Sequence, residues 1–225
     1  MTAEHNTGAT ETPDPGAESV TPSVTYTRTG DDGTSTLGDG SRTQKDDLRI
    51  VAYGETEEAS AAIGLAISLG SLPDPVIVLL SRLQNDLLDL GADLCAPGEG
   101  AGSPALRIDR GYVARLERAC DHFNAGLPAL PSFAIPGGTT TAALLHHART
   151  VVRRTERATA RARQSFGDSM NPLLGAYLNR LSSLLFILAR GANSEHGDTL
   201  WQPGLSTACD GYELWETPAE ATDEP

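Results

Sequence analysis

The sequence lacks the features that mark several classes of protein. It has no run of 18 apolar residues and no basic N-terminal stretch followed by an apolar segment, so we expect neither a membrane span nor a secretory signal peptide. Its three cysteines, Cys95, Cys120 and Cys209, lie far apart, and no CxxC or Cys/His cluster has metal-ligand spacing. We therefore predict reduced thiols, a cytoplasmic location and no metal site built from protein side chains.

Basic residues are also scarce, because 17 lysines and arginines face 30 acidic residues and the net charge is −13. Residues 1–22 carry four acids and residues 205–225 carry six, both without Lys or Arg, which leaves −3 for residues 23–204. We expect both acidic ends to be disordered and residues 23–204 to form one domain. The acidic balance argues against nucleic acid as a partner.

Apolar residues recur at helical spacing in five segments, and almost nothing in the chain has a strand pattern. The spacing and the capping residues predict helices over about 46–69, 74–95 and 109–125, a fourth after the turn at 135–138, and a fifth from 171–172 to about 192. The fold class is therefore all-α, a five-helix bundle with an extended, glycine-rich N-terminal arm. For the first helix we expect the buried side to contain Ile50, Tyr53, Ala61, Ile63, Leu65 and Ile67.

The fourth helix contains the run ARTVVRRTER, residues 148–157. Arg149, Arg153, Glu156 and Arg157 recur at spacings of three and four and so share one side of the helix. Stacked guanidinium groups repel one another unless an anion lies across them, and Arg offers planar, multi-donor contacts to phosphate oxygens. Two interpretations stay open for this helix alone, a solvated basic face with internal ion pairs or a polyphosphate site.

Three further features have both a functional and a structural interpretation. The glycine-rich loop 29–40 (TGDDGTSTLGDG) and Lys45 can receive an anion or form an ordinary surface hairpin, and the loop is not a Walker A motif. Asn179, in a Leu-rich helix, can orient a ligand or make a hydrogen bond inside the bundle. His146 and His147 are adjacent, so on a helix they point apart and cannot serve one site. Trp201 and Trp215 show no sign of a site.

Together these motifs resemble one family. The strings YTRTGDDGTSTLGDGSRTQKDDLR (26–49), AYGETEEASAAIG (52–64), FAIPGG (133–138), ARTVVRRTER (148–157) and YLNRLSSLLFILAR (177–190) look like the PduO-type ATP:cob(I)alamin adenosyltransferases. The segment LQNDLLDLGADLCAP (83–97) fits as well. The resemblance covers about residues 24–204 in the same order and with compatible spacing.

The resemblance implies a homotrimer with active sites between neighbouring subunits, in which the 5′-deoxyadenosyl group of ATP moves to cob(I)alamin and triphosphate leaves. It implies Mg²⁺ with the nucleotide, a flavoprotein reductant and a cobalamin-dependent enzyme as partners. Arg153, Arg157 and Asn179 match catalytic residues, Phe133 matches the aromatic residue that excludes the lower cobalt ligand, and Glu57 and Arg149 match an ion pair between subunits. By matching position, ATP contacts fall on Thr27, Arg28, Thr29, Gly30, Ser35, Thr36, Lys45, Arg153, Arg154, Glu156, Arg157 and Asn179.

Three positions depart from the family's usual pattern. Glu57 and Ser60 stand where the family usually has Asp and Asn in the first helix, and Ser183 stands where it usually has Asp in the fifth. These departures favour an alternative hypothesis, a divergent paralogue that binds corrinoid or nucleotide without turnover or has been recruited to different chemistry.

Overall fold

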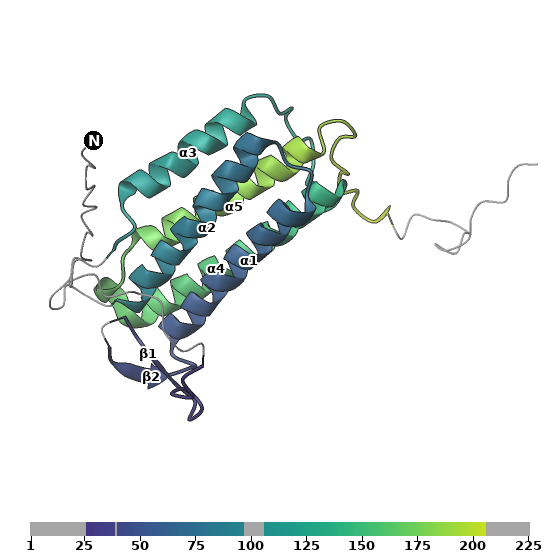
Figure 1. Cartoon of the computed structure of the whole chain (residues 1–225). Coiled ribbons are helices and arrows are strands. Elements are labelled where there is room, and N and C mark those ends of the chain that lie inside the picture. The colour runs from purple at the N-terminus through teal and green to yellow at the C-terminus, as the bar shows by residue number, and fades with distance from the viewer. Residues whose placement is uncertain (1–25, 39, 97–105, 206–225) are drawn as a thin grey trace, which may run out of the picture.

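The computed structural model describes residues 26–38, 40–96 and 106–205, and these form five long helices with a small hairpin at the N-terminal end (Figure 1). The predicted tail at residues 1–22 and nearly all of the tail at 205–225 lie outside the described residues. The five helices confirm the predicted bundle, with ends that differ from the expected ones by no more than about two residues. The elements are β1 (Thr34–Thr36), β2 (Arg42–Gln44), α1 (Leu48–Leu69), α2 (Asp74–Cys95), α3 (Arg110–Asn124), α4 (Thr140–Phe166), the 3₁₀ turn η1 (Gly167–Ser169) and α5 (Leu173–Ala192).

Capping side chains set where the helices begin. The Asp47 carboxylate accepts a hydrogen bond from the main-chain N–H of Arg49 at the start of α1, and Asp109 and Thr139 cap α3 and α4 in the same way. Each cap satisfies a main-chain donor that has no partner inside its helix. At the far end of α4, Gly167 has φ 58°, a left-handed conformation that glycine adopts without strain and that stops the helix.

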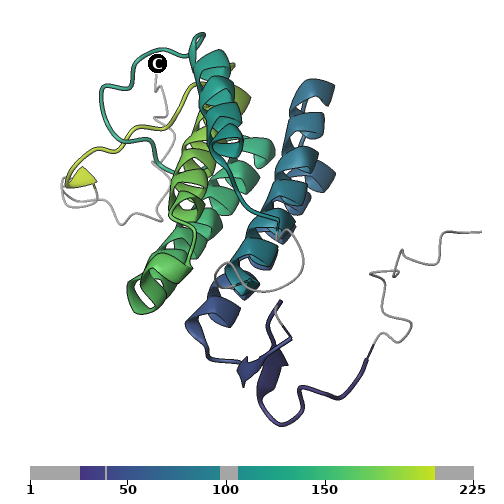
Figure 2. The same cartoon turned by 90° about the vertical axis from the view of Figure 1, so that its left-hand side faces the viewer.

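The helices pack as neighbours in the order α2, α1, α4, α5 and α3. Figure 2 shows α1 and α2 side by side in blue, with the green and teal helices on the other side of the bundle. Helix α5 is long and apolar enough, by length and composition, to cross a membrane. Its residues Tyr177, Leu178 and Leu181 are nevertheless fully buried in the bundle. This is the position of the core helix of a helical bundle.

Helix α1 buries a different side from the predicted one. Ala61 and Leu65 are exposed, Leu65 by 47%, and of the predicted residues only Ile63 is fully buried. The side that faces the core has small residues instead, including Ala52, Ala59 and Ala66. The prediction holds for Ile63 and was wrong for Ala61 and Leu65, because α1 packs on its neighbours largely through small side chains.

The N-terminal arm is a two-stranded antiparallel hairpin, which is one of the two forms that the sequence allowed for the glycine-rich loop. Thr34 pairs with Gln44, and Thr36 pairs with Arg42. Gly38 N–H donates to the carbonyl of Cys95 at 2.9 Å, which fastens the arm to the end of α2. The arm therefore lies at the end of the bundle where α1 begins, α2 ends and α4 ends.

Candidate functional site

The first group of predicted site residues lies in the arm. The hydroxyl oxygens of Thr27 and Thr29 are 2.8 Å apart. A Cβ atom on Gly30 would lie 3.2 Å from Nζ of Lys45, so a glycine at this position lets the ammonium group lie against the loop. Arg28 has φ 60°, a conformation uncommon for residues other than glycine. The arm thus gathers hydroxyl groups, one ammonium group and a glycine turn, which is the chemistry of an anion site.

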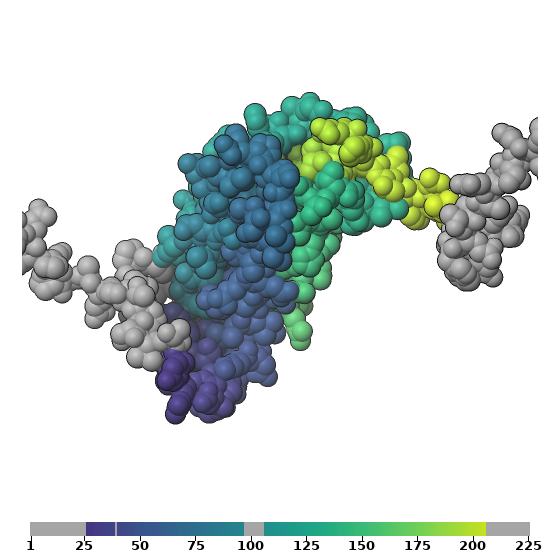
Figure 3. Space-filling view, turned by 45° about the vertical axis from the view of Figure 1, so that its right-hand side comes forward, coloured from purple at the N-terminus to yellow at the C-terminus, as the bar shows by residue number. Residues whose placement is uncertain are grey.

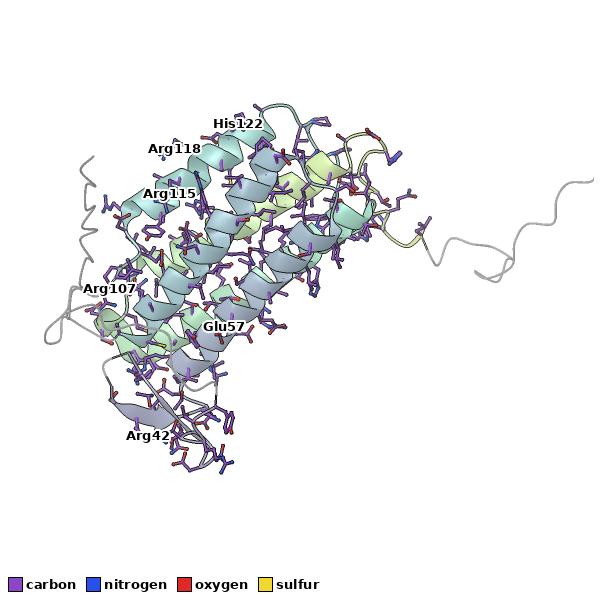
Figure 4. All side chains as sticks on the ribbon, viewed as in Figure 1. Arg42, Glu57, Arg107, Arg115, Arg118 and His122 are labelled. Atoms are coloured by element: carbon purple, nitrogen blue, oxygen red, sulfur yellow. The ribbon has the colours of Figure 1, made fainter. Side chains whose placement is uncertain are left out.

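Arg42 holds the loop of this arm in shape, and the sequence reading had given it no role. Its Nη2 donates to the carbonyl of Thr29 at 2.7 Å and forms an ion pair with Asp32 at 3.2 Å. It also contacts the hydroxyl of Thr34. In the sequence, Arg42 follows the glycine-rich loop closely, and this position could have indicated that it contacts the loop. Figure 4 shows Arg42 in the hairpin and Glu57 farther along the bundle on α1.

The second group lies along the seam between α4 and α5. The Asn179 side chain donates to Oε1 of Glu156 at 3.0 Å, and its own carbonyl oxygen accepts from Nη1 of Arg180 at 2.6 Å. Asn179 therefore already has a partner on the neighbouring helix, as one of its two interpretations required. The guanidinium of Arg157 donates to the carbonyl of Arg153 at 3.0 Å, and both side chains are exposed.

A cavity of about 950 Å³ continues this seam toward the other end of the bundle. Its charged lining residues are Arg149 and Arg153, and no acidic residue lines it. Its polar floor comes from Ser182 and Ser183 of α5. Apolar walls with two cationic groups suit a large, mostly apolar ligand that carries an anionic part. The aromatic lining residues are Phe133, Phe186 and Trp201.

Trp201 is the main lining residue that the sequence reading missed. The segment around it pairs with the loop before α4, because Trp201 N–H donates to the carbonyl of Phe133 at 2.7 Å and Ile135 N–H donates to that of Thr199 at 2.8 Å. The hydroxyl of Ser132 donates to the carbonyl of Trp201 at 2.9 Å. Phe133 remains 76% exposed, which leaves its ring free to contact a ligand. No sequence signal links two residues this far apart.

The positive charge of the cavity comes from Arg149 and Arg153. The Arg149 guanidinium lies 5.8 Å from the centroid of the Phe186 ring, and burial followed by repulsion from Arg153 lowers the pKa of Arg149. His146, also on α4, is only 2% exposed, and its ring centroid is 5.9 Å from that of Phe186. Burial, and next the charge of Arg149, lower the pKa of His146, which favours the neutral imidazole. As predicted, His147 points elsewhere and is exposed.

Several predicted residues are not brought together within one chain. Arg153 and Phe166 are separated by about 20 Å along α4, at 1.5 Å per residue. The arm lies at the Phe166 end, where the Arg49 guanidinium is 4.2 Å from the Phe166 ring centroid. The arm group and the seam group are therefore two half-sites at different places on the same chain.

Two further predicted residues have partners on their own chain. Arg154 faces α1 rather than α5, because its Nε forms an ion pair with Glu55 at 2.6 Å and its Nη2 contacts Glu58. Glu57 accepts a hydrogen bond from the Tyr53 hydroxyl at 3.1 Å and is exposed. The contact of Arg154 with ATP and the pairing of Glu57 with Arg149 between subunits stay predictions.

The two positions where serine departs from the family pattern also have defined places. The carbonyl of Ser60 accepts a hydrogen bond from the Gln84 side chain at 2.9 Å, so this residue helps to join α1 to α2. Ser183 lines the cavity, and its hydroxyl donates to the carbonyl of Asn179 at 3.1 Å. The described residues contain no group of three or more His, Cys, Asp or Glu side chains that could hold a metal ion.

Comparisons with known proteins point in one direction. Residues 25–192 match the family described as cobalamin adenosyltransferase. The chain is 54% identical over 180 residues to a corrinoid adenosyltransferase of Mycobacterium tuberculosis, a match that covers 80% of this chain and 93% of the relative. It is 45% identical to a cobalamin adenosyltransferase of Cupriavidus metallidurans, which covers 78% and 92%. Among solved structures, a variant of the PduO-type ATP:corrinoid adenosyltransferase of Lactobacillus reuteri, complexed with cobalamin and ATP, aligns with a TM-score of 0.75 and 31% identity, over 80% of this chain and 97% of that one.

Proposed function

Because this chain belongs to the cobalamin adenosyltransferase family, we propose that it transfers the 5′-deoxyadenosyl group of ATP to the cobalt of cob(I)alamin or of a related corrinoid. ATP-dependent adenosylation of a corrinoid is the activity of the family. The observation that carries the detailed proposal is the separation of the two half-sites. The arm of one protomer and the α4–α5 seam of its neighbour together supply the groups that a nucleotide needs.

The triphosphate is the part of ATP that this pair of half-sites suits. Lys45, the threonine hydroxyls and the loop N–H groups of one arm contact its oxygens, and Arg153 and Arg157 of the neighbouring seam contact them from the other side. Asn179 and Glu156, already joined by a hydrogen bond of 3.0 Å, orient the rest of the nucleotide. Arg28, Gly30, Ser35 and Thr36 are further proposed contacts of the arm.

The chemistry asks the protein for position and charge rather than for a general base. The Co(I) centre of the substrate is itself the nucleophile, and its electron pair forms the Co–C5′ bond. The C5′–O bond breaks, and its electron pair leaves with triphosphate. The residues of this chain hold C5′ in line with cobalt and stabilise the charge that develops on the departing oxygen. Arg153 and Arg157 are the groups that supply this stabilisation.

The 950 Å³ cavity is the place proposed for the corrinoid. The rings of Phe133 and Trp201 cover one face of the macrocycle and leave no room for a ligand below cobalt. Exclusion of that ligand favours a four-coordinate Co(II) state, which is easier to reduce to the nucleophilic Co(I) state. A flavoprotein is the proposed electron donor, and a cobalamin-dependent enzyme is the proposed recipient of the product.

Mg²⁺ is the metal proposed to accompany the nucleotide. The described residues contain no cluster of three acidic, His or Cys side chains. They therefore suit an ion such as Mg²⁺, which takes most of its ligands from water and phosphate oxygens. Glu156 is the carboxylate in the seam that would contact it. When bound, the ion supplies charge neutralisation for the triphosphate, and the arginines orient the same group.

A homotrimer in the cytoplasm is the proposed state of the protein. Three copies related by a three-fold axis bring each arm to the next seam and close the ring, so that no half-site is left unfilled. The exposed apolar residues Val51, Leu65 and Leu69 on α1 support association through this helix. Arg149 and Glu57 are the proposed ion pair across that interface.

Mixing two inactive variants tests the site between subunits. Lys45→Ala removes a group from the arm and Arg153→Ala removes one from the seam, so each variant alone loses adenosylcobalamin formation. Randomly mixed trimers regain about a quarter of the wild-type sites, because a site is intact when the arm comes from one variant and the seam from the other. The absorbance of adenosylcobalamin measures recovery after mixed refolding. No recovery, with both variants trimeric, would exclude a site shared between chains.

A further inference from the structure

The cavity and the acidic C-terminal segment of this chain are complementary in charge. The cavity is lined by two guanidinium groups, Arg149 and Arg153, and among the described residues neither forms an ion pair with a carboxylate. The Nε–H of Arg149 is buried and has no hydrogen-bond acceptor among the described residues. Residues 206–225 carry six acidic side chains and no Lys, Arg or His. A cationic cavity and a polyanionic segment thus belong to one chain.

The two are also complementary in apolar character. Residues 210–216 read DGYELWE, so Tyr212, Leu214 and Trp215 stand among three carboxylates. The cavity walls combine Phe133, Phe186 and Trp201 with the two arginines. An acidic segment without aromatic residues would match the arginines alone, whereas this one offers a partner to the rings as well.

The described chain ends beside the cavity. Trp201 lines it and is fastened to the Phe133 loop by main-chain hydrogen bonds, and the last described residue, Leu205, follows four positions later. In Figure 3 the yellow C-terminal segment lies against teal surface and leads away from the body of the molecule. Five extended residues span about 17 Å, and this is how far Asp210 can lie from Leu205.

From these observations we propose that residues 210–216 bind in the cavity of their own chain when it holds no corrinoid, and that they compete with the corrinoid for it. The inference rests on the proposed function, because it places the competitor in the proposed corrinoid site. Glu213 and Glu216 approach the cationic lining of the cavity, with Arg153 as their ion-pair partner while no ATP is bound, and Tyr212 and Trp215 contact the aromatic wall. The tether sets an effective concentration of the order of millimolar, so even a weak contact raises the apparent dissociation constant of the corrinoid.

Two variants of the full-length chain with the same change in charge provide the test. One carries Asp210→Asn, Glu213→Gln and Glu216→Gln, and the control carries Glu220→Gln, Asp223→Asn and Glu224→Gln. Equilibrium binding of cob(II)alamin is measured at low salt without nucleotide, because ATP would occupy Arg153. The first variant should bind about three- to tenfold more tightly than wild type, because a tethered competitor is weakened, and the control should differ by less than about twofold. Equal affinities for the three proteins, or equal gains in both variants, would overturn the proposal.

A peptide separates failure of this inference from failure of the proposed function. A labelled peptide of residues 206–225 should bind the first variant, as measured by fluorescence anisotropy, and cob(II)alamin should displace it. The same peptide with the three inner acids neutralised should bind more weakly, and 0.5 M salt should weaken the native peptide. Absence of peptide binding at millimolar concentration defeats the inference even if cob(II)alamin binds. Peptide binding without any cob(II)alamin binding counts against the proposed function instead.

Discussion

Phe133 and Trp201 form one wall of the cavity although 67 residues lie between them in the sequence. The main-chain N–H of Trp201 donates to the carbonyl of Phe133 at 2.7 Å, and the centroids of the two rings are 6.0 Å apart. Main-chain hydrogen bonds therefore decide which aromatic groups face the cavity proposed for the corrinoid. The first prediction concerns the residue of this pair that the family motifs did not indicate.

Replacing Trp201 by Ala should raise the KM for the corrinoid about tenfold, because an aromatic contact worth about 1 kcal/mol or more is lost. The KM for ATP should change less, since Trp201 is not one of the proposed ATP contacts. Trp201→Phe, which keeps a ring, should stay within about threefold of wild type. Steady-state kinetics with each substrate varied in turn measure both constants. A parallel rise in the KM for ATP would contradict this division of the site.

Arg153→Lys should raise the KM for ATP about tenfold while the charge is preserved, because lysine cannot make the planar, paired contacts of a guanidinium with phosphate oxygens. Arg161, two turns later on the same helix and also exposed, provides the matched control. Arg161→Lys should leave both KM values within about twofold. If the two variants behave alike, the arginines of α4 act as general surface charge and have no defined contact with the nucleotide.

Stability should depend on Asp47 in acid. The side-chain hydrogen bond from Arg49 is the largest cause that lowers the pKa of Asp47, from 3.8 to about 2, and this carboxylate also caps α1. Because the folded pKa is below the unfolded one, the stabilisation is complete above about pH 4 and is lost as the pH falls toward 2. Asp47→Ala should lower the free energy of unfolding by about 2 kcal/mol at pH 7.

The difference between Asp47→Ala and wild type should shrink as the pH falls from about 4 to about 2, since the wild-type carboxylate becomes protonated there. Urea unfolding at several pH values measures this difference. Asp46→Ala is the control, because Asp46 is exposed and does not cap the helix. A difference that is independent of pH would show that the charge of Asp47 has no role.

The buried hydroxyl of Tyr177 should contribute to stability without affecting the site. It donates to Oδ2 of Asp86 at 3.1 Å, and burial raises the pKa of Tyr177 well above its usual range. Tyr177→Phe leaves Asp86 with Arg115, 3.2 Å away, as its remaining charged partner and should cost about 1–2 kcal/mol. Tyr112→Phe should cost less, because Tyr112 is partly exposed and water can replace its bond to Asp89. Denaturant unfolding measures the free energy lost in each variant. An equal loss in both would show that burial of the Tyr177 hydroxyl does not increase its contribution.

Helix positions could be predicted from local signals, because a cap and an apolar period act within a few residues. Asp47, Asp109 and Pro172 stand at the starts of α1, α3 and α5 as expected. The buried side of α1 could not be predicted in the same way. Close packing against α1 requires small residues such as Ala59. Helix α1 has apolar residues on more than one side, and the neighbouring helices decide which side is buried.

The candidate site also has parts that the sequence predicted and parts that required the tertiary structure. The sequence by itself determined the family, the arginine run of α4, the glycine arm and Phe133, because each is a motif of residues close together in the chain. Only the tertiary structure decided that Trp201 shares a cavity with Phe133, that Arg154 faces α1, and that Arg153 lies about 20 Å along α4 from the helix end near the arm. These are relations between distant segments, set by how whole helices pack, and no local pattern of residues encodes them.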